Sequence, residues 1–251
     1  MSLGDAAIIL VAGVWAGMIN VVVGSGTLVT FPVLLALGYP PLTANVSNGL
    51  GLVPGSLTGA IGYRRELCGL RTRVVRLGIG SVLGGLVGAL LLLVLPSGAF
   101  DAVVPVLVAL SVVLVVVQPW VKSWLERRAG DTRRTEVGPG LVVASFGTGV
   151  YGGYFGAAQG ILLMALLGIG LDDDMQRHNA VKNVMAMLAN LVSGIVFVFV
   201  APVSWPVVGL VATGAVIGGL VGARVGRKLP PVVLRGVIVV VGIAALVQLL
   251  S

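Results

Sequence analysis

The chain has 251 residues, of which 57% are hydrophobic and only 10% are charged, and its mean hydropathy is +1.10. A soluble domain carries about 25% charged residues and cannot enclose this many apolar side chains without large exposed patches. The composition therefore excludes a soluble globular protein and predicts an all-α polytopic membrane protein in a lipid bilayer. The net charge is +7, but the basic residues form short clusters between apolar runs, which argues against binding of nucleic acid.

Eight apolar blocks follow one another along the chain. They cover residues 6–37, 43–63, 77–95, 102–121, 137–171, 179–200, 205–223 and 232–250. Six have the length of one membrane span of about 20 residues, whereas the first and fifth blocks are too long for a single span. Each long block is interrupted by small residues, which read Gly24-Ser25-Gly26 and Gly156-Ala157-Ala158-Gln159-Gly160. We expect each long block to fold back on itself at this interruption.

The order of one long and three short blocks occurs twice, and the two halves of the chain resemble each other. Residues 82–89 read VLGGLVGA and residues 216–223 read VIGGLVGA, and Asn48 recurs as Asn183 at nearly the same offset. An internal repeat of this kind is typical of transporters. The sequence predicts two repeats, residues 1–130 and 131–251, each a helical hairpin followed by three transmembrane helices.

The positions of the basic residues predict the topology. All 16 fall in four groups, at 64–76, 122–134, 177–182 and 224–235. Lys and Arg collect in cytoplasmic connections. Re-entrant hairpins place all four groups on one side of the membrane, so we expect inverted repeats with cytoplasmic basic loops and the C-terminus outside. Eight plain spans, which divide the groups between the two sides, are the alternative.

The two interruptions predict a binding site. A helix broken inside a bilayer is tolerated only where protein buries the break or a wet cavity faces it. A new half-helix begins after each break, and its free N–H groups and positive dipole end favour an anion. We expect a substrate site at the two tips, formed by Gly24, Ser25, Gly26 and Thr27 and by Gln159 and Gly160.

A polar helix start follows each hairpin. Asn45 and Asn48 are spaced i,i+3, and Asn179, Lys182 and Asn183 are spaced i,i+3,i+4, so each set lies on one helical face. We expect each face to meet its own hairpin and to contribute to the substrate site. Hydrogen bonding between helices is an equally good explanation for Asn45 and Asn48. No acidic residue is expected at the depth of Lys182, which favours contact with an anion over snorkelling.

Catalytic groups are missing from the apolar blocks. No carboxylate lies inside a span, no nucleophile has an orienting base, and no paired Cys or His could hold a metal, so we expect neither an enzyme nor a cofactor. The run Asp172-Asp173-Asp174 is better explained by solvated charge and helix capping than by a metal site.

Glycines at four-residue spacing mark two equivalent helices. They are Gly80-Gly84-Gly88 and Gly214-Gly218-Gly222. Such spacing lets helix backbones approach closely. We expect these ladders to form either the contact between the repeats or the face of a homodimer.

Both halves resemble the paired signatures of the TauE/SafE sulfite exporter family. The likeness rests on GMINVVVGSGTLVTFPVLLALGYPPLTANVSN at 17–48, GVYGGYFGAAQGILLMALLGIGL at 149–171, NAVKN at 179–183 and GGLVGAR at 218–224. The second tip departs from the family pattern, because Ala157-Ala158-Gln159 replaces a more glycine-rich run. The resemblance implies an inner-membrane permease of bacteria or archaea for small sulfur-containing anions such as sulfite, thiosulfate, sulfoacetate or related organosulfonates. We expect alternating access around the tips; an anion channel or a permease for a non-sulfur anion is the alternative.

Overall fold

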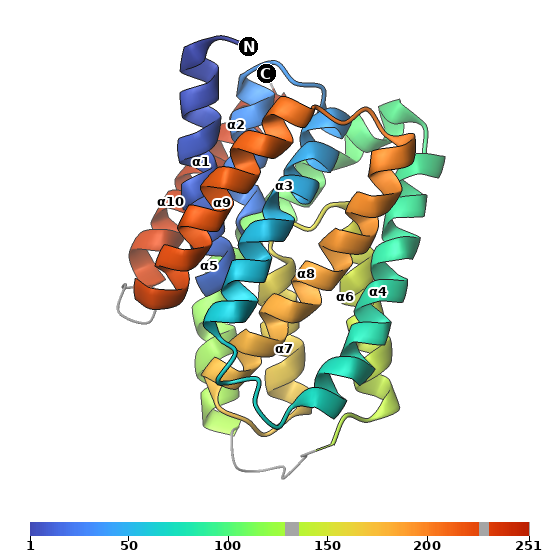
Figure 1. The fold of residues 1–251 in the computed structure, drawn as a ribbon, viewed down its shortest axis with the longest axis vertical. Coiled ribbons are helices and arrows are strands. Elements are labelled where there is room, and N and C mark those ends of the chain that lie inside the picture. Colours follow the sequence, from blue (N-terminus) through green and yellow to red (C-terminus); the bar gives the residue numbers. More distant parts are fainter. Residues whose placement is uncertain (129–135, 226–230, 251) are drawn as a thin grey trace.

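A computed structural model describes residues 1–128, 136–225 and 231–250. Within these ranges every regular element is a helix and there is no β-strand, which confirms the all-α prediction (Figure 1). The helices are α1 (Leu3–Val22), α2 (Thr27–Ala36), α3 (Pro41–Gly62), α4 (Arg71–Val94), α5 (Ser97–Arg128), α6 (Pro139–Tyr154), α7 (Gln159–Gly170), α8 (Met175–Val200), α9 (Trp205–Val225) and α10 (Pro231–Leu250). The predicted repeat boundary at residue 130 and the basic residues Arg133, Arg134, Arg227 and Lys228 lie outside the described residues.

Five of these helices, α1, α4, α5, α8 and α9, are long and apolar enough to cross a membrane. Large apolar side chains stay exposed on the outside of the bundle, for example Val94 at 82% and Phe199 at 81%. Exposed apolar surface of this extent is stable against lipid rather than water. The chain is therefore a multi-pass membrane protein.

Both long blocks are interrupted where the sequence predicts. The first divides into α1 and α2, and the second divides into α6 and α7. Gly24 and Gly156 adopt positive φ angles of 89° and 78°, a conformation that a residue without a Cβ reaches without strain. Helices α4, α5 and α8 are clearly longer than predicted, because α4 begins at Arg71, α5 covers Ser97–Arg128 and α8 begins at Met175. A hydropathy window detects the apolar part of a helix and misses polar turns that continue beyond it.

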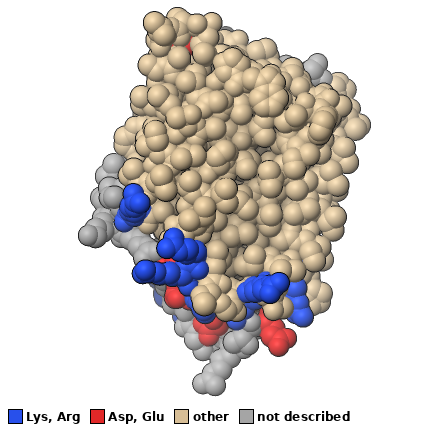
Figure 2. All heavy atoms as spheres, viewed as in Figure 1, with Lys and Arg blue, Asp and Glu red and all other residues tan. Residues whose placement is uncertain are grey.

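The two helix pairs enter the molecule from opposite ends. In Figure 1, α1 begins and α2 ends at the upper end, where the N-terminus lies, whereas α6 begins and α7 ends at the lower end. The Lys and Arg side chains on the face in Figure 2 gather toward the lower end, which we call the basic end. There Arg177 Nη2 donates to the Cys68 carbonyl at 3.1 Å, and Arg73 pairs with Asp173. The loop between α3 and α4 and the start of α8 thus lie together at the basic end.

The glycine ladders bring helices from the two halves of the chain into contact. A Cβ at Gly218 in α9 would lie 1.9 Å from the Val14 carbonyl oxygen in α1, and a Cβ at Gly84 in α4 would lie 2.1 Å from the Phe146 carbonyl oxygen in α6. A side chain at either position would collide with backbone. The predicted role in contact between the two halves is confirmed, because the ladders pack α9 on α1 and α4 on α6.

Candidate anion site at the helix breaks

The two helix breaks contact each other directly. The Gly160 N–H donates to the Gly24 carbonyl at 3.0 Å, and a Cβ built on either glycine would lie 2.4 Å from the Cα of the other. Helices α2 and α7 begin within the two tips, at Thr27 and Gln159. Most of their first N–H groups are already satisfied, because Leu28 donates to the Ser25 carbonyl at 3.1 Å and Ile161 donates to the Ala158 carbonyl at 3.0 Å, so the expectation of free N–H groups at the tips is wrong for these positions. The structure thus brings together the two tips that the sequence singles out.

Asn48 of α3 holds the first tip. Its Nδ2 donates to Thr27 Oγ1 at 3.3 Å, and its Oδ1 accepts a hydrogen bond from Thr30 Oγ1. Asn48 meets its own hairpin, as predicted. The residues at the corresponding positions of the second hairpin are Ile161 and Met164. Neither has a hydroxyl, and the buried Nδ2 of Asn183 has no hydrogen-bond partner among the described residues.

The broken ends of α1 and α6 each receive a donor from the opposite half of the chain. Lys182 Nζ in α8 donates to the carbonyls of Asn20 and Val21 at the end of α1, at 3.2 and 3.1 Å. Asn45 Nδ2 in α3 donates to the Tyr154 carbonyl at the end of α6, at 3.0 Å. The last carbonyls of a helix lack partners within it, so these donors satisfy them. The expectation that each polar face meets its own hairpin is wrong for Lys182 and incomplete for Asn45, which bonds to the second hairpin and also faces Thr27 of its own. Helical spacing gives the face but not the neighbour.

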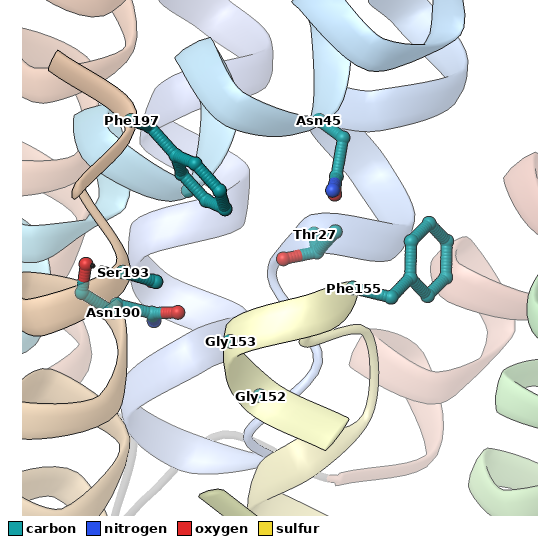
Figure 3. A pocket seen from close by; sticks show the side chains of 9 residues that line it. Thr27, Asn45, Gly152, Gly153, Phe155, Asn190, Ser193 and Phe197 are labelled. Atoms are coloured by element: carbon teal, nitrogen blue, oxygen red, sulfur yellow. Dashed lines mark hydrogen bonds between the residues drawn. The ribbon is translucent and has the colours of Figure 1, made fainter. Parts of the chain in front are cut away.

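A small cavity lies beside the first tip. It has room for about one water molecule, with a volume of about 10 Å³. Its lining consists of Thr27, Asn45, Gly49, Gly152, Gly153, Phe155, Asn190, Ser193 and Phe197. In Figure 3 the Thr27 hydroxyl and the Asn190 amide point toward each other across the cavity, between the rings of Phe155 and Phe197. This lining offers hydroxyl and amide groups and two aromatic rings, and it contains no charged side chain.

The other predicted site residues lie outside this lining. Gln159 Nε2 donates to the Thr148 carbonyl at 3.2 Å and takes the space that a side chain at Gly152 would need. Ser25 Oγ and Asn179 Oδ1 are buried and have no hydrogen-bond partner in the part of the chain that the structure describes. An unsatisfied buried polar atom is rare in a stable fold, so both stay candidates for contact with a ligand.

Sequence reasoning missed two polar cavity residues, Asn190 and Ser193. They follow Asn183 by seven and ten residues and share its helical face, so the polar stripe of α8 continues for about three turns past the predicted site. The prediction stopped at the polar start of the helix, where Asn and Lys are dense. The same i,i+3/i+4 spacing, followed into the apolar part of the helix, is the signal that would have found them.

The acidic run before α8 has a structural role. Asp174 accepts hydrogen bonds from the N–H groups of Gln176 and Arg177 at 2.8 and 2.9 Å, and Asp173 binds Arg73 and Arg177. The predicted capping is confirmed. No group of three His, Cys, Asp or Glu residues suited to a metal ion occurs among residues 1–128, 136–225 and 231–250.

Comparison with known proteins gives a family match and several relatives. The family model described as sulfite exporter TauE/SafE matches residues 9–249. A probable membrane transporter protein of Sinorhizobium is 27% identical and covers 98% of this chain and 92% of its own length. A probable membrane transporter protein of Haemophilus influenzae is 25% identical over 93% of this chain and 90% of the relative. The probable membrane transporter protein YfcA of Escherichia coli is 28% identical over 85% of this chain and 76% of the relative.

Proposed function

Because the chain belongs to the TauE/SafE sulfite exporter family, we propose that it carries small sulfur-containing anions, such as sulfite, thiosulfate, sulfoacetate or related organosulfonates, across the inner membrane of a bacterium or archaeon. The family and the relatives named as transporters point to a membrane transporter rather than an enzyme. The observation that carries the proposal is the cavity beside the first tip, which combines a helix start with polar side chains and contains no carboxylate.

The chemistry of the lining fits an oxyanion with an apolar part. Thr27 is the first residue of α2, where the helix dipole is positive, and it presents its hydroxyl to the cavity beside the amides of Asn45 and Asn190. Hydroxyl and amide N–H groups can donate to sulfite or sulfonate oxygens. The rings of Phe155 and Phe197 offer an apolar surface to sulfur or to a short carbon chain.

The size of the cavity supports alternating access. Room for about one water molecule is too little for sulfite or a sulfonate, so an anion enters only when the tips or their neighbours move. Two helix breaks that hold each other through one hydrogen bond, from Gly160 to Gly24, suit such a movement. We propose that the two halves rock about this junction.

We further propose that the halves are inverted repeats with re-entrant hairpins. Their contacts correspond in pairs, because α1 packs on α9 as α6 packs on α4, and α3 packs on α9 as α8 packs on α4. Each hairpin returns to the end of the molecule where it starts, and the α3–α4 loop shares the basic end with the start of α8. Eight plain spans would separate these two segments. The excess of Arg at this end supports its placement on the cytoplasmic side.

The test is uptake by proteoliposomes that contain the purified protein. We expect saturable uptake of a sulfur anion with counterflow. Thr27→Val should raise KM about tenfold, because it removes one hydrogen bond to a charged ligand. Thr213→Val is the matched control, since Thr213 is exposed on α9 and its hydroxyl donates to the Gly209 carbonyl of its own helix.

Other results would select the alternatives. Single-channel currents without counterflow would identify an anion channel. Uptake of carboxylates or phosphonates, with no uptake of any sulfur anion, would identify a permease for a non-sulfur anion and overturn the proposed substrate. Equal KM values for wild type and Thr27→Val would show that the cavity is not part of the binding site.

A further inference from the structure

Lys182 is a buried basic side chain at the broken end of a helix. It is the eighth residue of α8, its exposed fraction is 1%, and its ammonium donates to the carbonyls of Asn20 and Val21. These carbonyls belong to the last turn of α1, where the helix dipole is negative and where the backbone has no further helical partner.

Within the described ranges, the Lys182 side chain bonds to no carboxylate. The acidic residues of the described ranges lie in loops or near helix ends, and the recorded partners of the Lys182 ammonium are backbone carbonyls. A buried ammonium that has only neutral partners is expensive. Its presence inside a membrane protein therefore calls for a functional reason.

The carbonyl that corresponds to Asn20 at the other tip is that of Tyr154, at the end of α6. It shows that a broken helix end in this protein does not need a positive charge. Asn45 supplies a neutral amide to the Tyr154 carbonyl at the end of α6. A neutral donor is thus enough to satisfy a carbonyl at this depth. The feature that Lys182 adds at the end of α1 is its positive charge.

Carbonyl oxygens at the C-terminal ends of broken helices are the groups that bind coupling cations such as Na⁺ in secondary transporters. We propose that Lys182 is a tethered cation that occupies such a cation site at the end of α1, so that the transport cycle needs no alkali cation. Removal of the side chain should leave a site of carbonyl oxygens that a small alkali cation can enter. The inference rests on the chain being a transporter and not on the identity of the anion.

The experiment is thermal unfolding of the purified protein, followed by tryptophan fluorescence, in gluconate salts of Li⁺, Na⁺, K⁺ or N-methyl-D-glucamine at equal ionic strength. We expect the wild type to have the same Tm in all four salts. Lys182→Ala should have a lower Tm in N-methyl-D-glucamine and a saturable rise of several degrees with one alkali cation. Lys182→Gln, whose side chain fills the site without charge, should have a lowered Tm that no cation raises. Arg127→Ala, at an exposed position near the end of α5, is the control for loss of a positive charge.

Three results would overturn the proposal. The first is a Lys182→Ala protein with the same Tm in every salt. The second is a Lys182→Gln protein that matches the wild type in both Tm and uptake. The third is wild-type uptake that depends on Na⁺, and this measurement decides if Lys182→Ala gives no folded protein; equal rates in Na⁺ and N-methyl-D-glucamine support the tethered cation. The unfolding experiment contains no sulfur anion, so its failure and a failure of the proposed substrate are distinguishable.

Discussion

Two asparagines at matching positions of the two halves have different surroundings, which makes them a natural pair of variants. Asn48 bonds to Thr27 and Thr30, whereas the Nδ2 of Asn183 has no partner among the described residues. We expect Asn48→Leu to lower the free energy of unfolding by about 2 kcal/mol, because it breaks two hydrogen bonds and leaves buried hydroxyls less satisfied. Asn183→Leu should cost much less, since it removes a donor that is already unsatisfied.

Thermal unfolding of both variants, measured side by side in detergent, checks this difference. Equal losses of stability would show that the two amides are held equally well. The comparison also bears on the substrate site, because an unsatisfied amide is free to donate to an anion. Asn183→Leu should therefore affect uptake more than stability, and Asn48→Leu should affect both.

At the scale of elements, the close approach of α9 to α1 depends on glycine at one face only. A Cβ at Gly218 would lie 1.9 Å from the Val14 carbonyl oxygen, whereas a Cβ at Gly209 in the same helix would have nothing within 4 Å. We expect Gly218→Ala to destabilise the protein by about 1–3 kcal/mol, because the helices must move apart. Gly209→Ala should be neutral or stabilising by up to about 1 kcal/mol through its helix propensity. Chemical or thermal unfolding distinguishes them, and equal effects would contradict close packing of α9 on α1.

The turns on either side of α2 offer a second matched pair. Gly24 and Gly38 have similar φ angles of 89° and 83°, but only Gly24 contacts another backbone, that of Gly160. We expect Gly38→Ala to cost about 1–2 kcal/mol of conformational strain and to leave uptake unchanged. Gly24→Ala should cost more and abolish uptake, because its Cβ separates the two tips. A Gly24→Ala protein with normal uptake would show that contact between the tips is dispensable.

The sequence predicts the elements better than it predicts their neighbours. Hydropathy and small residues place the helices and both breaks, because the apolar blocks and the glycines are local features. The partners of Asn45 and Lys182 are not predictable in this way, because each side chain reaches a carbonyl in the opposite half of the chain. The cavity residue Asn190 is missed for a different reason, because the prediction stopped at the polar start of α8 although Asn190 continues the helical face of Asn183.

At the scale of the whole molecule, the proposed topology can be tested with the single natural cysteine. Cys68 is free and exposed in the loop between α3 and α4 at the basic end. We expect it to react with a membrane-impermeant maleimide in inside-out vesicles and not in intact cells. In a Cys68→Ser background, Asp172→Cys should react from the same side as Cys68, because positions 68 and 172 share the basic end. Gly98→Cys should react from the other side, because position 98 lies in the first turn of α5, after α4 has crossed the membrane.

Eight plain spans make the opposite prediction for this experiment. They would place positions 98 and 172 on one side of the membrane and position 68 on the other. That outcome would reject the re-entrant hairpins and the inverted repeats together. It would leave the all-helical fold and the glycine contacts unaffected.

The pairing of α1 with α9 also has a consequence for how the protein is made. The glycine face that receives α1 belongs to a helix that begins only at Trp205, so most of the chain must leave the ribosome before the first helix has its partner. Contacts between segments this far apart in the chain form late and slow the completion of folding. Until then α1 and its polar tip stay in the translocon or in lipid without the neighbour that buries them, and a chain that terminates before α9 is a natural target for membrane quality control.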